Sequence, residues 1–269
     1  MNRSKKMARL PLIEDIDHET DAAIEARLDE RFQVLEDLSV AVTIGEVRGM
    51  IVSGPPGLGK SFTIEKVLAE YDPTESVYTI VKGYVRATAI IRLLYQYRHP
   101  GNVIVFDDAD SVFFDDVSLN LLKAACDTTD RRLVSYMTEN PMEDEDGGVI
   151  PKSFVFEGCV IFITNLDFDR EIDRGAKLAP HFSALISRSL YIDCGMKSRR
   201  DYMVRIRQVI NQGMLADLTP DQRSDVIGFI EDNADSLREL SLRTAIKLAG
   251  IRKSNGERFE KIARVTLCR

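Results

Sequence analysis

The segment Gly54–Ser61, with the sequence GPPGLGKS, constrains the fold of this chain more than any other. It directly follows the apolar run Met50–Val52, which is typical of a β-strand that enters a tight loop. Gly54, Gly57 and Gly59 allow the backbone to bend so that successive N–H groups point inward, toward the oxygens of a phosphate group. Apolar residues then recur with helical spacing: Ile64, Val67, Leu68 and Tyr71. Strand, loop and helix together predict a nucleotide-phosphate site rather than a chance glycine turn.

The residues of this loop have separate expected roles. Lys60 is expected to neutralise the β- and γ-phosphates of a nucleotide, and Ser61 is expected to offer its hydroxyl to Mg²⁺. The N-terminal end of the following helix presents a partial positive charge to the same anion. The predicted nucleotide-binding residues are Gly54, Pro55, Pro56, Gly57, Leu58, Gly59, Lys60 and Ser61.

An acidic cluster follows the apolar strand Val103–Phe106. Asp107 and Asp108 come at the carboxyl end of this strand, which is the edge where open α/β sheets bind ligands. Asp107 is therefore expected near the Mg²⁺ held by Ser61, and Asp108 near the water that attacks the γ-phosphate. The alternative is a solvated acidic turn.

A second core strand, Cys159–Thr164, is followed by Asn165. The amide of Asn165 can hold the attacking water beside Asp108; the alternative is an asparagine that only caps the strand. Between the two core strands, residues 133–137 are expected to form a strand. The acidic segment 139–151 is expected to form a solvated loop or a hairpin tip.

Helices are predicted on both sides of this region. The N-terminal one spans residues 20–38 and carries Ile24, Leu28, Phe32 and Leu35 at helical spacing. The C-terminal part reads as a helical lid, in which Thr219–Gln222 forms a capping box with proline at the first helical position. On a later helix, Leu242, Ala245, Ile246 and Ala249 share a face, and Arg243 lies about 100° from Leu242. From there Arg243 can reach toward phosphate, or it can be an ordinary surface arginine.

Composition narrows the possible partners. The chain of 269 residues has 36 basic and 43 acidic residues, and its net charge of −7 argues against a broad nucleic-acid-coating surface. A narrow basic lining that contacts nucleic acid stays an alternative. The cysteines Cys126, Cys159, Cys194 and Cys268 are too far apart for a zinc knuckle or a redox pair, which predicts a reducing, intracellular compartment.

The chain is not expected to associate with a membrane, because no apolar run approaches the ~20 residues of a membrane span. Four basic residues near the start have no hydrophobic region after them, so a secretory signal is not expected. These residues are predicted to form a disordered basic tail, with weak nucleic-acid contact as the alternative: Arg3, Lys5, Lys6 and Arg9.

The ordered set of segments resembles the AAA+ ATPase family over roughly residues 30 to 252. The segments are GPPGLGKS, VIVFDDAD, VIFITN, Ser187–Arg188 before a strand, and Ser241–Thr244 in a helix. In family terms these are similar to Walker A, Walker B, sensor 1, the arginine finger and sensor 2. The implied fold is an α/β P-loop NTPase with a parallel five-stranded sheet sandwiched by helices and a small all-helical lid. The sensor 1 strand would separate the Walker A and Walker B strands. Compact stand-alone AAA+ proteins of bacteriophages are similar in their size and in the Lys-Gly-aromatic turn after the second strand.

The resemblance implies an ATPase that uses ATP and Mg²⁺. Its catalytic residues would be Asp108, Asn165, Arg188 and Arg243, with Ser61 and Asp107 at the metal. The nucleotide-binding domain would span residues 1–193, with its N-terminal helical lead-in, and the lid residues 194–269. The protein would work in the cytoplasm, or in the host cytoplasm if it is viral.

Its expected action is to remodel a protein or nucleic-acid complex as a homo-oligomeric ring. The alternatives are a DNA replication accessory or loader ATPase, and an ATP-gated assembly scaffold in which hydrolysis is incidental. The resemblance does not identify the protein or nucleic-acid partner.

Three positions leave questions open. The family usually has glutamate where this chain has Asp108, and a carboxylate set back by about 1 Å lowers the expected turnover. Arg174 is the alternative to Arg188 as the finger. Tyr84 either belongs to a central-pore loop that grips a polypeptide or packs inward at a helix start.

Overall fold

The computed structural model describes residues 19–144 and 146–269. The predicted basic tail, from Arg3 to Arg9, lies outside the described residues. Within the described part of the chain, no helix has both the length and the apolar character needed to cross a bilayer.

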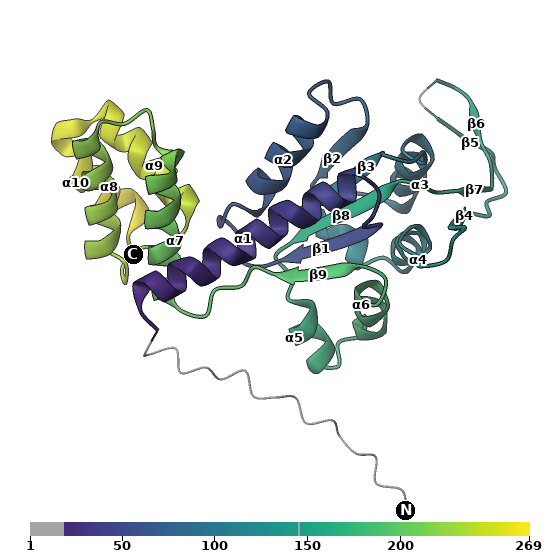
Figure 1. Ribbon diagram of the computed structural model, residues 1–269, viewed down its shortest axis with the longest axis horizontal. Helices are drawn as coiled ribbons and strands as arrows, with labels where there is room; N and C mark the ends of the chain where they lie inside the picture. Colours follow the sequence, from purple (N-terminus) through teal and green to yellow (C-terminus); the bar gives the residue numbers. More distant parts are fainter. Residues whose placement is uncertain (1–18, 145) are drawn as a thin grey trace, which may run out of the picture.

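A parallel five-stranded sheet forms the centre of the fold, with the strand order β2-β3-β8-β1-β9 (Figure 1). Its strands are β1 (Gly49–Ser53), β2 (Tyr78–Lys82), β3 (Val103–Asp107), β8 (Cys159–Thr164) and β9 (Leu190–Asp193). The strand that ends before Asn165 lies between the one that enters the phosphate loop and the one that ends in Asp107. This is the predicted order, and the predicted fold class is confirmed.

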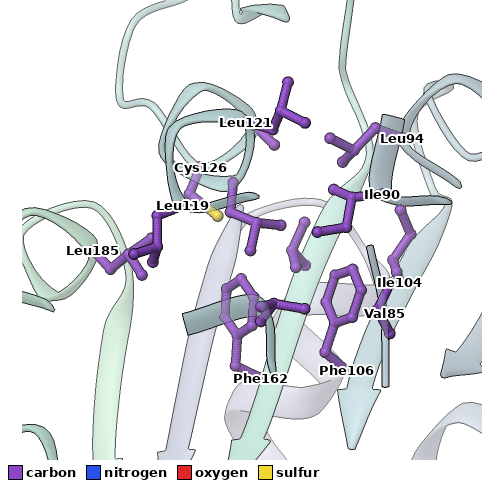
Figure 2. Close-up of a cluster of buried hydrophobic side chains, with 14 of the residues drawn as sticks. Val85, Ile90, Leu94, Ile104, Phe106, Leu119, Leu121, Cys126, Phe162 and Leu185 are labelled. Carbon is purple, nitrogen blue, oxygen red and sulfur yellow. The ribbon is translucent and has the colours of Figure 1, made fainter. Parts of the chain in front are cut away.

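Helices cover both faces of the sheet. Side chains alternate between the two faces along each buried strand, so each strand contributes to two cores. Met50 and Val52 pack with α1 (Asp21–Thr43) and α2 (Lys60–Tyr71). Ile51 points to the other face. The helices on that face are α3 (Ala87–Gln96), α4 (Asp116–Ala125), α5 (Phe168–Asp173) and α6 (Ala179–Ile186). Figure 2 shows Phe106 and Phe162 standing from β3 and β8 into this second core, where their rings stack 5.6 Å apart.

A hairpin is inserted between α4 and β8 and extends away from the sheet (Figure 1). Strand β4 (Leu133–Ser135) pairs with β7 (Ser153–Val155), and β5 (Met142–Glu143) pairs with β6 (Val149–Ile150). The predicted hairpin tip is therefore confirmed. The strand predicted through residue 137 ends at Ser135, because β7 pairs with only the first part of it.

The C-terminal lid has a core of its own, made within residues 206–263. Its elements are α7 (Arg199–Val209), the π-turn η3 (Ile210–Met214), α8 (Pro220–Asp232), α9 (Leu242–Ser254), η4 (Gly256–Arg258) and α10 (Phe259–Leu267). The capping box of Thr219 and Gln222 is present as predicted. Ile246, predicted to share one face with Leu242 and Ala245, is 55% exposed, whereas Leu248 is buried in the lid core. The boundary at residues 193 and 194 stays a prediction.

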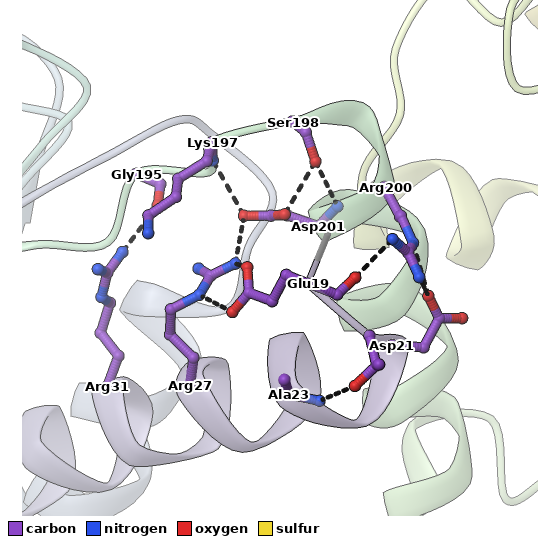
Figure 3. Close-up of polar contacts among 11 residues, drawn as sticks. Glu19, Asp21, Ala23, Arg27, Arg31, Gly195, Lys197, Ser198, Arg200 and Asp201 are labelled. Atoms are coloured by element: carbon purple, nitrogen blue, oxygen red, sulfur yellow. Dashed lines mark hydrogen bonds and ion pairs between the residues drawn. The ribbon is translucent and has the colours of Figure 1, made fainter. Parts of the chain in front are cut away.

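Helix α1 is longer than predicted and contacts the lid as well as the sheet domain. Figure 3 shows the polar contacts between the start of α1 and the first lid helix. On α7, the fully buried carboxylate of Asp201 accepts hydrogen bonds from Arg27 Nη2 at 3.2 Å and from Ser198 Oγ at 2.9 Å. Arg200 Nε donates to Asp21 Oδ1 at 2.7 Å. These contacts attach the start of α1 to the first lid helix, while its second half packs against α2 and β1.

Candidate nucleotide-binding site

The loop that follows β1 has the backbone of an anion cradle. Gly54, Gly57 and Gly59 all have positive φ angles, 144°, 74° and 100°, which L-residues with a side chain rarely adopt. A Cβ on Gly57 would lie 2.7 Å from Ser241 Cβ, so the close approach of the lid also requires glycine at this position. Helix α2 begins at Lys60 without a side-chain cap, which leaves its first N–H groups for an anion.

Lys60 lies inside this cradle and is only 5% exposed. Its Nζ donates to Gly54 O at 2.6 Å, to Pro55 O at 2.8 Å and to Asn165 Oδ1 at 3.4 Å. Burial lowers the pKa of Lys60, and the nearby carboxylates of Asp107 and Asp108 oppose that shift. The ammonium group is therefore fixed where the phosphates of a nucleotide would lie.

The two predicted metal ligands meet as expected. Ser61 Oγ donates to Asp107 Oδ1 at 2.9 Å, and Asp107 is 3% exposed. Mg²⁺ prefers oxygen ligands and commonly takes one or two from the protein and the others from phosphates and water. This hydroxyl–carboxylate pair, beside a phosphate cradle, fits such an ion.

Asp108 and Asn165 also lie together. Asn165 Nδ2 donates to Asp108 Oδ1 at 2.8 Å, so the amide bridges Lys60 and Asp108. Asp108 has a left-handed backbone with φ of 49°, which aspartate tolerates better than most residues and which is common at functional sites. Its N–H donates to Ile163 O at 3.0 Å, which fixes the turn against β8.

The lid closes one side of the cleft above the loop. The N–H of Leu242 donates to Gly57 O at 2.9 Å, which joins the start of α9 directly to the phosphate loop. The cleft has a volume of about 890 Å³ and is lined by Lys60, Ser61, Asp108, Asn165 and Arg243, among others. This is the size range of small-molecule sites. Arg243 therefore lies at the cleft, as predicted.

Arg188 is the one predicted catalytic residue outside this cleft. It precedes β9, whose first residue Leu190 is in register with Met50, so it lies at the amino end of the parallel sheet. Its Nη1 donates to Ala184 O at 2.8 Å, and Asp127 lies 4.0 Å from its Nε. The phosphate loop is at the opposite end, about 16 Å away at ~3.3 Å per strand residue. Arg174, which forms an ion pair with Glu171, does not line the cleft either.

Tyr84 follows β2 and is 77% exposed. The alternative in which its ring packs inward is therefore wrong. Its role in a pore loop stays a prediction.

Three residues near the site were not predicted to have a role there. Lys82 Nζ lies 3.2 Å from Asp107 Oδ2, because Lys82 ends β2 in register with Asp107. Asp110 accepts a hydrogen bond from Thr164 Oγ1 at 2.6 Å and ties the turn after β3 to the end of β8; burial raises its pKa. Arg205 lines the cleft from α7. The signal for Lys82 was available in the sequence, since it begins the Lys-Gly-aromatic turn that directly follows the second predicted strand.

Fold and site together define a P-loop α/β protein with a helical lid. No protein-family model matches the chain. The chain is 35% identical, over 244 residues, to the uncharacterized 36.7 kDa protein of the nrdC–mobD intergenic region of Enterobacteria phage T4. The match covers 89% of this chain and 74% of the phage protein. The chain belongs to the family of that phage T4 protein.

Solved structures give more distant similarities. NtrX from Brucella abortus in complex with ADP has a TM-score of 0.46 and 14% identity, covering 83% of this chain and 50% of the NtrX chain. PCH-2 from C. elegans has a TM-score of 0.39 and 11% identity, covering 91% of this chain and 68% of PCH-2. This chain thus spans about half of NtrX.

Proposed function

We propose that this protein is an Mg²⁺-dependent AAA+ ATPase. The observation that carries the proposal is the chain of contacts from Lys60 through Asn165 to Asp108, which lies in the same cleft as Ser61. Ser61 in turn donates a hydrogen bond to Asp107. A cation, two oxygen ligands and a second carboxylate side by side match the needs of phosphoryl transfer to water.

Each group has a role in this reaction. The loop N–H groups and Lys60 bind the phosphates and neutralise their charge. Ser61 and Asp107 would hold Mg²⁺, which would supply charge neutralisation at the phosphates. Asp108 orients the attacking water and accepts its proton, and Asn165 fixes the position of that water. Because Asp108 is shorter than the usual glutamate, we expect slow turnover but ordinary ATP affinity.

The arginines complete the proposed mechanism. Arg243 reaches the cleft from the lid. Its contact with the phosphates couples closure of the lid to nucleotide binding. Arg188 stabilises the charge of the transition state in a neighbouring subunit, since its own phosphate loop is at the other end of the sheet. A homo-oligomeric ring is therefore part of the proposal. Its action is to remodel a protein or nucleic-acid complex, and the exposed ring of Tyr84 supports a contact with that substrate.

The second candidate is an ATP-gated assembly scaffold, which Asp108 favours because a retracted carboxylate suits binding better than rapid hydrolysis. A replication accessory or loader ATPase is the other alternative. Stimulation of ATP hydrolysis by single-stranded DNA would distinguish the loader from the scaffold, in which hydrolysis is incidental.

Replacing Lys60 by alanine tests the proposed function at the binding step. We expect the affinity for ATP to fall by about tenfold or more, because hydrogen bonds to charged groups contribute roughly 1.5–3 kcal/mol. A calorimetric titration with MgATP measures this change. Lys253→Ala is the matched control, because this lid lysine pairs with Asp217 outside the cleft. Equal affinities for the Lys60→Ala and wild-type chains would contradict the assignment of the loop.

A further inference from the structure

Arg205, on the first lid helix, is a buried cation beside the cleft. It is 6% exposed, and its guanidinium lies 3.6 Å from the ring centroid of Phe32 on α1. Its Nη1 donates to Gln208 Oε1 at 2.9 Å, while its buried Nε has no hydrogen-bond partner. Among the residues that the structure describes, no carboxylate forms an ion pair with it.

Such a group is unusual in a folded protein. Burying a charge is unfavourable unless it is paired, and buried guanidinium groups normally have a carboxylate or phosphate partner. Burial lowers the pKa of Arg205 to about 10, so the group stays protonated at neutral pH. Asp29 on α1 favours the charged form only from a distance.

Arg205 lies where an anion is expected. It lines the same cleft as Lys60 and Arg243. Its Nη2 lies 3.9 Å from the position that a Cβ on Gly59 would occupy. Gly59 is the N-cap of α2, where the loop presents its N–H groups. The guanidinium therefore faces the phosphate cradle from the lid side, and Phe32 and Gln208 hold its plane in place.

We propose that Arg205 is a second lid arginine that binds the phosphates of the nucleotide, so that the lid recognises the polyphosphate through α7 as well as through Arg243 on α9. This inference rests on the proposed function. The competing explanation is purely structural: Arg205 would only join α7 to α1 through its contact with Phe32.

The two explanations differ in what Arg205→Met does to the protein without nucleotide. If the role of Arg205 is to bind phosphate, its charge is uncompensated in the nucleotide-free protein. Methionine, an apolar side chain of similar length, removes that charge, so the melting temperature should stay constant or rise. If its role is structural, the melting temperature should fall and nucleotide affinity should not change.

The experiment compares Arg205→Met with Arg207→Met. Arg207 is on the same helix but pairs with Asp21 and Glu231 outside the cleft. Titrations with ATP, ADP and adenosine are combined with thermal unfolding of the nucleotide-free chains. For Arg205→Met we expect about tenfold or more weaker binding of ATP and ADP, and unchanged binding of adenosine. Arg207→Met should keep all three affinities and lower the melting temperature.

Unchanged ATP and ADP affinity in Arg205→Met would overturn the proposal. If this variant does not fold, Arg205→Lys keeps the charge but loses the planar fork, and several-fold weaker binding of both nucleotides is expected. Wild-type affinity for both in that variant would also overturn it. A wild-type chain that binds no nucleotide would contradict the proposed function as well, whereas loss of the Arg205 effect alone would leave that function intact.

Discussion

Mixing Asp108→Asn subunits with Arg188→Ala subunits should restore ATP hydrolysis that neither variant shows alone. Arg188 lies at the amino end of the sheet, beside Asp127, and the phosphate loop lies at the carboxyl end. The side chain is thus too far from its own site. An Asp108→Asn subunit still carries an intact Arg188, which it can present to the intact Asp108 of an Arg188→Ala neighbour. Because a well-placed arginine contributes ~10³ to 10⁵ in rate in the strongest cases, the recovery should be large.

The mixture needs two controls. Exchange of subunits must be confirmed independently, for instance by energy transfer between labelled variants. Arg174→Ala replaces Arg188→Ala in a parallel series, and it should hydrolyse ATP by itself if Arg188 is the finger. A rate near zero at every mixing ratio, with exchange confirmed, would exclude an arginine supplied by the neighbour and remove the main argument for a ring.

Asp108→Asn by itself should lose about 10² to 10⁴ in turnover and keep its affinity for MgATP. The amide can still accept a hydrogen bond from Asn165 but cannot accept a proton from water. Asparagine is also the appropriate substitution for the backbone, since both residues tolerate the left-handed conformation observed at this position. Turnover in single-cycle and steady-state assays, with binding measured in parallel, separates the two effects.

Parental turnover in Asp108→Asn would show that another group activates the water. Asp108→Glu is a less direct test, because two effects oppose each other. Its longer side chain brings the carboxylate closer to the water, but glutamate is less favourable than aspartate at φ of 49°.

Features that depend on local spacing could be predicted from the sequence. The phosphate loop, the strand ending in Asp107 and the strand before Asn165 each combine an apolar run with polar residues at its end. Parallel strands bring such ends to one edge, so the meeting of Ser61 with Asp107 followed from the motifs.

Features that depend on packing between distant segments could not be predicted in this way. Arg205 has the spacing of an ordinary surface residue on α7, and only the approach of α1 encloses it against Phe32. Ile246 fits the apolar stripe of α9, yet the orientation of that helix against the phosphate loop leaves it exposed in the cleft. Strand β7 has only three residues, which is too short for a clear period.

The central claim is that this chain hydrolyses ATP at the loop between β1 and α2. The most direct test is steady-state phosphate release from ATP by the full chain, with and without Mg²⁺, beside the Lys60→Ala chain. We predict release that requires Mg²⁺ and that falls to background in Lys60→Ala. Release at the same rate in both chains, or none in the wild-type chain under conditions where it binds MgATP, would contradict the assignment of an ATPase.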